Sequence, residues 1–215
     1  MTSAEHVYID CGTHRLEARV QWRSLEHGAL LCHPHPLYGG SMENNVVLAL
    51  ESTYGARGWT TLRFNFRGVE GSTGTYGDGD GEVQDIVFVH RWLHERGVQG
   101  LHLAGYSFGA WVAVRACAQG IDPQTLALVS PPVDFLDFTD LLLPPCPTWI
   151  LVGDGDAFAK VERVRAWVES QKSPERLLHL DLCPHADHFY WGREQEIRRF
   201  LGNFLDSVTG SAKNA

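Results

Sequence analysis

The sequence has few cysteines and no arrangement of them that would bind a metal or build a disulfide framework. Its 215 residues include five cysteines, an odd number, and no Cys-x-x-Cys pair. Widely spaced cysteines of this kind indicate reduced, mostly buried thiols and argue against a zinc knuckle. They are Cys11, Cys32, Cys117, Cys146 and Cys183.

Long apolar runs and a surplus of basic residues are also missing. No stretch approaches the roughly 20 apolar residues that cross a bilayer, and residues 1–10 lack the charged and apolar regions of a signal peptide. The chain has 18 Lys and Arg against 26 Asp and Glu, a formal net charge of −8. We therefore expect a cytoplasmic protein that binds no nucleic acid and no membrane, with a small molecule as its partner. A monomer and a homodimer are both compatible with the sequence.

Short apolar runs alternate with segments of helical period along the chain. Segments 7–10 and 15–22 alternate apolar and polar residues, as half-exposed antiparallel strands do. Later runs are continuously apolar, which is typical of strands buried on both faces of a parallel sheet. These strands are expected at 29–32, 60–64, 101–104, 126–129, 148–152 and 177–182, and helices at 45–57, 82–96, 108–119, 157–172 and 194–208.

The alternation of strands and helices predicts an α/β fold. We expect a single, mostly parallel, doubly wound sheet with an N-terminal antiparallel hairpin and helices on both faces. No repeat, linker or change of composition divides the chain. One domain over residues 1–209 is therefore expected, followed by a frayed tail of small and polar residues, 210–215.

A Gly-x-Ser-x-Gly motif at residues 105–109 lies directly between an apolar run and a helical period. In that context a serine occupies a sharp strand-to-helix turn, and the small flanking residues let neighbouring backbone segments pass close by. The hydroxyl of Ser107 would project above the sheet, beside the N–H of Phe108 at the positive end of the helix. An ordinary glycine-rich turn is the alternative, so the interpretation depends on partners for the serine.

An activated serine needs a base to accept its proton and an acid to orient that base. In this fold they follow in the order Ser, Asp or Glu, His. Asp154 and Asp156 follow the apolar run 148–152, at the strand end where open α/β sheets place their sites. His185 and His188 follow the next run. The residues alone leave both pairs open, with a plain turn or a surface loop as the role of the member that is not catalytic.

Five motifs spread over most of the chain carry a family resemblance. They are His33-Pro34-His35-Pro36 with Gly39-Gly40, Arg63-Phe64-Asn65-Phe66-Arg67-Gly68, Gly105-Tyr106-Ser107-Phe108-Gly109, Gly153-x-x-Asp156 and Asp187-His188-Phe189. Together they resemble the α/β-hydrolase superfamily, and within it the small lidless serine hydrolases of the carboxylesterase and dienelactone-hydrolase type. The resemblance implies Ser107 as nucleophile, Asp156 as acid and His188 as base, without a cofactor. It leaves Asp154 and His185 as second choices.

The oxyanion hole of such an enzyme uses backbone N–H groups to stabilise the charge that develops on the tetrahedral intermediate. Phe108 would supply one donor. The second is expected from the loop 33–40, in which Pro34 and Pro36 have no N–H to offer. The resemblance to the His-Gly-x loop of the family favours Leu37, with His35 next.

The sequence contains two further candidate sites, a group of potential metal ligands and a glycine-rich loop. The imidazoles and carboxylate of His33, His35, His185, Asp187 and His188 could form a metal cluster, but no motif with ligand spacing supports one, so no metal is expected. The glycine-rich segment 71–82 lacks both the phosphate-loop pattern and the glutamate of a calcium hand. We interpret it as a flexible surface loop.

The connection between the expected strands 126–129 and 148–152 is short, which limits what can cover the site. About 18 residues separate 129 from 148, and five of them are proline, which leaves room for a short helix at 133–140 but not for a helical lid. An open site suits short, water-soluble esters or thioesters. Amide hydrolysis with the same triad and a non-catalytic binding protein of this fold are the alternatives. The residues expected to contact the substrate are Leu37, Tyr38, Tyr76, Phe158 and Phe189, with Phe108 as a further apolar wall.

Overall fold

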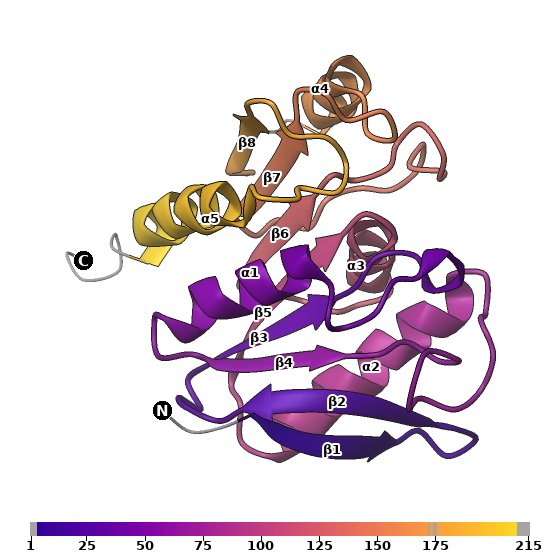
Figure 1. Cartoon of the computed structure of the whole chain (residues 1–215). Coiled ribbons are helices and arrows are strands. Elements are labelled where there is room, and N and C mark those ends of the chain that lie inside the picture. The colour runs from indigo at the N-terminus through magenta and orange to yellow at the C-terminus, as the bar shows by residue number, and fades with distance from the viewer. Residues whose placement is uncertain (1–3, 172, 174–175, 210–215) are drawn as a thin grey trace.

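The computed structural model describes residues 4–171, 173 and 176–209, which form one eight-stranded sheet flanked by helices (Figure 1). The predicted tail, 210–215, and residue 172 of the fourth predicted helix lie outside the described residues. The strands are β1 Glu5–Asp10, β2 Arg15–Gln21, β3 His27–Cys32, β4 Thr60–Phe64, β5 Gly100–Tyr106, β6 Thr125–Val129, β7 Thr148–Gly153 and β8 Leu178–Cys183. The helices are α1 Asn45–Gly55, α2 Asp80–Glu95, α3 Phe108–Ala118, α4 Val161–Ser170 and α5 Glu194–Thr209, with a 3-10 turn, η1, at Pro36–Tyr38.

The order of the strands confirms the predicted fold class. It is β1-β2-β4-β3-β5-β6-β7-β8, in which β2 pairs antiparallel with β1 and β4 and the other neighbours pair in parallel. The order reverses at β3, because the chain passes from β3 to β4 on one side and then returns to β5 on the other. Open α/β sheets bind ligands at the carboxyl ends of the strands next to such a reversal. The loops after β3 and β5 are therefore where a site is expected.

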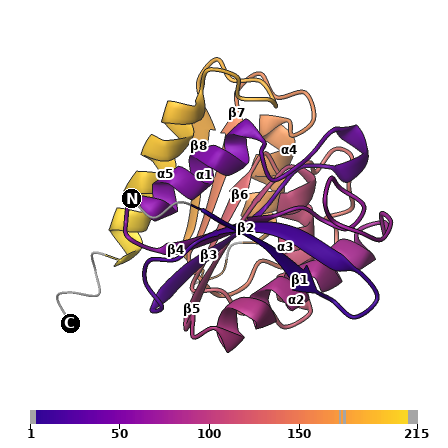
Figure 2. The same ribbon diagram turned by 60° about the horizontal axis from the view of Figure 1, so that its bottom comes forward.

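Helices cover both faces of the sheet, as the two ribbon views show (Figures 1 and 2). On one face α1 and α5 lie side by side and bury their apolar residues against the strands, and on the other face α2, α3 and α4 do the same. Strands β4 to β7 are buried at every residue, which explains why apolar residues predominate in them. No helix of the described chain has both the length and the apolar character that crossing a membrane would take.

Two segments that had room for helix form turns instead. The fourth helix begins at Val161 rather than at 157, because the carboxylate of Asp156 accepts the N–H groups of Phe158 and Ala159 and closes a turn there. Residues 133–140 form turns and bends without a helix. Their N–H groups bond to the carbonyls of the preceding prolines and to the side chain of Asp137, which competes with a helical ladder.

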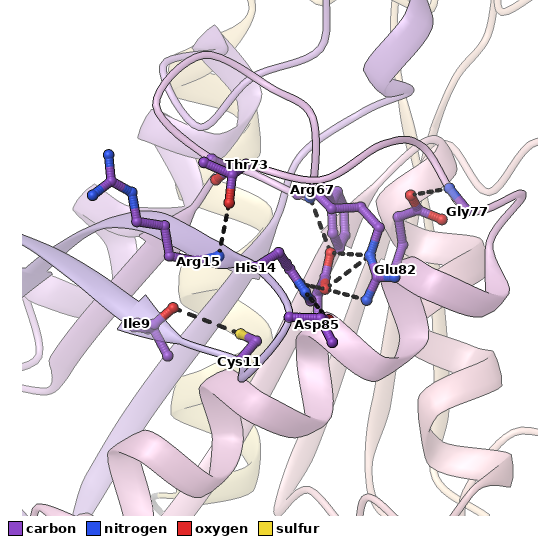
Figure 3. Close-up of polar contacts among 12 residues, drawn as sticks. Ile9, Cys11, His14, Arg15, Arg67, Thr73, Gly77, Glu82 and Asp85 are labelled. Atoms are coloured by element: carbon purple, nitrogen blue, oxygen red, sulfur yellow. Dashed lines mark hydrogen bonds and ion pairs between the residues drawn. The ribbon is translucent and has the colours of Figure 1, made fainter.

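The loop between β4 and α2, residues 65–79, is held by buried carboxylates (Figure 3). The sequence predicts a flexible surface loop over 71–82, whereas the structure ties this segment to the first turns of α2. Glu82 is completely buried and accepts the N–H groups of Gly77 and Gly79 at 2.9 and 2.8 Å. Asp85 is also completely buried and accepts from the Arg67 guanidinium at 2.6 Å and from Nε2 of His14 at 2.8 Å.

Because Asp85 joins the loop, α2 and the turn before β2, its charge is expected to matter for stability. We expect Asp85→Asn to lower the free energy of unfolding by about 3 kcal/mol, since it leaves Arg67 beside a neutral group. Urea denaturation would measure this loss. Glu95→Gln, an exposed substitution on the same helix, should change stability by less than about 0.5 kcal/mol. An Asp85→Asn variant as stable as this control would show that the charge of Asp85 does not stabilise the fold.

Candidate active site

Ser107 lies on the sharp turn that joins β5 to α3. Its backbone is left-handed, with φ 54° and ψ −118°, and its N–H donates to the carbonyl of Val129 in β6 at 2.9 Å. A Cβ on Gly105 would collide with the backbone of Gly109, and a Cβ on Gly109 would collide with the carbonyl of Cys32 in β3. Close backbone approaches therefore require glycine at both positions. The turn places Ser107 where the order of the strands reverses.

His188 bridges Ser107 and Asp156. Its Nε2 lies 2.9 Å from Oγ of Ser107, and its Nδ1 lies 3.0 and 2.9 Å from the two carboxylate oxygens of Asp156. Because an ionised carboxylate only accepts hydrogen bonds, Nδ1 carries the proton and Nε2 is left to accept from the serine hydroxyl. Asp156 and His188 are only 5% and 8% exposed. This arrangement can remove the serine proton and stabilise the imidazolium that results.

The second choices for acid and base lie outside this arrangement. Asp154 and His185 are both exposed, whereas Asp156 and His188 are buried. Asp154 bonds to β8 through its N–H, which donates to the carbonyl of Cys183. The structure therefore brings Asp156 and His188 together with Ser107, and leaves Asp154 and His185 on the surface of the adjacent turns.

The loop after β3, residues 33–40, is fixed by His33. This side chain is completely buried, and its Nε2 accepts the N–H of Phe66 at 3.0 Å. Its Nδ1 donates to the carbonyl of Pro34 at 2.6 Å. Both ring nitrogens are therefore used within the chain, which ties the loop after β3 to the loop after β4 and leaves neither nitrogen for a metal.

Burial lowers the pKa of His33 to about 4, from a usual value near 6.5, so the folded protein holds this imidazole neutral. Between these values the unfolded chain binds a proton that the folded chain does not. The contribution of His33 to the free energy of unfolding is therefore complete above pH 6.5. It is lost as the pH falls toward 4, by up to about 3 kcal/mol. Denaturation curves of wild type and His33→Gln should show a shallower pH dependence in the variant. A profile unchanged from wild type, as expected for the exposed control His185→Gln, would contradict this.

The three backbone N–H groups expected as oxyanion donors differ in whether an acceptor within the chain already binds them. Phe108 is the first residue of α3, where an N–H has no partner within the helix. The N–H of Leu37 donates to Nδ1 of His35 at 3.2 Å, and the Leu37 side chain is 66% exposed. Within the described residues, the N–H of His35 donates no hydrogen bond. The ring of His35 contacts that of Phe108, with centroids 4.7 Å apart.

Aromatic side chains gather around the imidazole of His188 and around His35. Phe158 and Phe189 lie 4.9 and 5.9 Å from the His188 ring, centroid to centroid, and both are substantially exposed. The rings of Tyr38 and Tyr76 lie 4.6 and 5.2 Å from that of His35. Phe108, by contrast, is buried in the core. These four rings, exposed at Tyr38, Phe158 and Phe189 and half-buried at Tyr76, form an apolar rim of the kind that lines ligand sites.

Three residues beside the site carry no obvious signal in the sequence. Phe135 is exposed and its ring lies 5.1 Å from that of Phe158. Ser130 and Tyr190 are buried, and the Ser130 hydroxyl bonds to Asp156. The only hint is position, because Ser130 directly follows β6 and so lies at the same edge of the sheet as Ser107.

Known proteins resemble this chain over most of their length. No protein-family model matches it. A solved α/β serine hydrolase homologue from Coxiella burnetii is 34% identical, with a TM-score of 0.86 over 95% of this chain and 99% of that one. XC6422 from Xanthomonas campestris, a member of the α/β serine hydrolases without a lid, is 30% identical, with a TM-score of 0.87 over 96% and 95%. The uncharacterised protein RP471 of Rickettsia prowazekii (strain Madrid E) is 34% identical over 187 residues, 84% of this chain and 79% of its own length.

Proposed function

Because the chain belongs to the α/β serine hydrolases, we propose that it hydrolyses small, soluble carboxylic esters or thioesters through an acyl-enzyme formed on Ser107. The observation that carries the proposal is the unbroken hydrogen-bonded series from the Ser107 hydroxyl through His188 to the buried Asp156. The three residues of this series lie between positions 107 and 188, and the loop 33–40 beside Phe108 extends the site toward the N-terminus. One catalytic domain over residues 1–209 is part of the same proposal, as is a cytoplasmic location.

Acylation begins when His188 takes the proton of Ser107 and Oγ attacks the acyl carbon. The electron pair of the C=O bond moves to the acyl oxygen. His188 then returns the proton to the leaving alcohol or thiol as the C–O or C–S bond breaks. Water attacks the acyl-enzyme in the same way, with its proton taken by Nε2, and Ser107 leaves with that proton. Asp156 keeps the tautomer with Nδ1 protonated and stabilises the imidazolium in both halves.

For the oxyanion hole we propose the N–H groups of Phe108 and His35. The sequence favours Leu37 as the second donor, but the Leu37 N–H is already engaged by Nδ1 of His35. His35 is pinned through its carbonyl, which accepts the N–H groups of Tyr38 and Gly40. A donor on a fixed backbone costs no reorganisation as the charge develops, which is what this role requires.

The apolar rim supports a short, partly apolar acyl group as substrate. Phe158 and Phe189 next to His188, with Tyr76 and Tyr38 next to His35, would contact an acyl chain held at Ser107. Leu37, although a poor donor, is exposed beside them and stays a candidate contact. Because three of these four rings are open to solvent, they would cover a short acyl chain and leave much of a long one in contact with water.

A matched series of esters, thioesters and amides tests the proposal. We expect kcat/KM to be highest for acetyl and butyryl esters and thioesters, to fall for long acyl chains, and to be lowest for amides, whose leaving group is poorest. Amides cleaved faster than their matched esters would favour the amidase alternative. A protein that turns over no member of the series, and that a fluorophosphonate does not label, would be a binding protein instead.

A further inference from the structure

Two buried hydroxyl groups form a hydrogen-bonded chain that ends on Asp156. Oγ of Ser130 lies 2.6 Å from Oδ2 of Asp156, and the hydroxyl of Tyr190 lies 2.8 Å from Oγ of Ser130. Ser130 and Tyr190 are both completely buried. The other carboxylate oxygen, Oδ1, is occupied by the N–H groups of Phe158 and Ala159, each at 2.8 Å.

The direction of this chain follows from its end. The ionised carboxylate of Asp156 can only accept, so Ser130 donates its single proton there and must accept from Tyr190. Burial holds the pKa of Tyr190 well above its usual value, so the phenol stays protonated and able to donate. Successive hydrogen bonds of one direction polarise each other, and the Tyr190 donor therefore strengthens the bond from Ser130 to Asp156.

The backbone is strained at both hydroxyl residues. Ser130 has φ 46° and Tyr190 has φ 55°, a left-handed conformation that residues with a side chain rarely adopt. In the described chain six residues other than glycine have φ between 46° and 57°, and Ser107, Ser130 and Tyr190 are three of them. Strain concentrated in one hydrogen-bonded network is typical of positions kept for function.

We propose that Ser130 and Tyr190 are positioning residues that fix the Asp156 carboxylate and thereby set the basicity of His188. The inference rests on the proposed function, because only in that mechanism does Asp156 act through His188. Oδ2 of Asp156 is shared between the Ser130 hydroxyl and Nδ1 of His188. The hydroxyl withdraws part of the negative charge that would otherwise stabilise the imidazolium. It holds the carboxylate in one orientation and moderates its attraction for the proton.

Loss of the Ser130 hydroxyl would end this sharing of Oδ2. Without the Ser130 hydroxyl, more of the Oδ2 charge faces Nδ1, so the imidazolium is stabilised and the pKa of His188 rises. The acidic limb of the pH profile should therefore move to higher pH. Two other titratable groups interact with this network, Tyr106 of β5 with both Asp156 and Tyr190, and Cys183 of β8 with Tyr190. Asp187 of the loop interacts with Tyr106, and all three groups remain in the variants below.

The test compares Ser130→Ala, Tyr190→Phe and the double variant with wild type, using the whole chain and p-nitrophenyl acetate. Ser130→Ala should lower kcat by about tenfold and raise the apparent pKa of the acidic limb by about half a unit. Tyr190→Phe should move both in the same direction by about a third as much. Because Tyr190 acts through Ser130, the double variant should match Ser130→Ala. Tyr54→Phe changes an equally buried tyrosine of α1, whose ring packs against Trp59 before β4, and as the control it should change neither quantity.

An NMR titration of the His188 ring in the same variants separates this inference from the proposed function, since it needs no turnover. If the wild type hydrolyses the ester and reacts with a fluorophosphonate, but Ser130→Ala leaves both the titration and kcat unchanged, the inference is overturned. Additive effects of Ser130→Ala and Tyr190→Phe would overturn the link between the two hydroxyls. A wild type without activity or labelling would end the proposed function, and a raised His188 pKa in Ser130→Ala would still support the coupling of Ser130 to the Asp156–His188 pair.

Discussion

Ser107→Ala is expected to lower kcat/KM for p-nitrophenyl acetate by about 10⁴-fold or more, to the residual rate that substrate binding and the oxyanion donors supply. The variant has no hydroxyl to bond to Nε2 of His188 and cannot form an acyl-enzyme. Alanine keeps the Cβ of serine, so the left-handed turn at this position should form as before and the urea midpoint should stay close to that of wild type.

Covalent labelling provides the matching readout for Ser107. Intact mass spectrometry after treatment with a fluorophosphonate should find one adduct on the wild type and none on Ser107→Ala. Ser52→Ala, an exposed serine on α1, serves as the control and should be labelled as the wild type is. Ester hydrolysis retained by the Ser107 variant would mean that another nucleophile carries the reaction.

Asp156→Asn is expected to lower kcat by about 10³-fold, while Asp154→Asn should leave it within about twofold. The amide of asparagine can still accept the N–H groups of Phe158 and Ala159, so the turn before α4 is kept. It carries no charge, and the imidazolium of His188 loses the partner that stabilises it.

Steady-state kinetics of the two asparagine variants, compared at one pH, decide between the carboxylates. They are two residues apart and undergo the same chemical change, so each is a control for the other. A large loss in Asp154→Asn with a small one in Asp156→Asn would transfer the role of acid to Asp154, although Asp154 is exposed and Asp156 is only 5% exposed.

Local patterns were sufficient to predict most of the fold. The continuous apolar runs of β3 to β7 and the amphipathic period of α5 each depend on neighbours within a few residues, and the sheet forms where these runs predict it. The prediction differed from the structure where a side-chain carboxylate binds nearby backbone N–H groups or another side chain. The carboxylates of Glu82 and Asp85 hold a loop that its composition predicts to be flexible, and Asp156 delays the start of α4.

In the candidate site too, local spacing predicts some residues and leaves others undecided. The turn at Ser107 follows from two glycines at fixed spacing, so the sequence predicts it directly. Between Asp154 and Asp156, or His185 and His188, the residues alone gave no preference, and family resemblance supplied one. Burial provides an independent physical reason for the same preference, since only a carboxylate and an imidazole out of water can form a strong, oriented pair.

The sequence by itself determined the succession of strands and helices along the chain and the position of the serine turn, because periodicity and steric fit act over short stretches of chain. Only the tertiary structure decided which hydroxyl groups form the hydrogen-bonded chain that ends on Asp156. Ser130 is 26 residues from Asp156 and 60 from Tyr190, and their hydroxyls meet because parallel strands end at one edge of the sheet. Contacts over such separations depend on strand order and register, which no local pattern encodes.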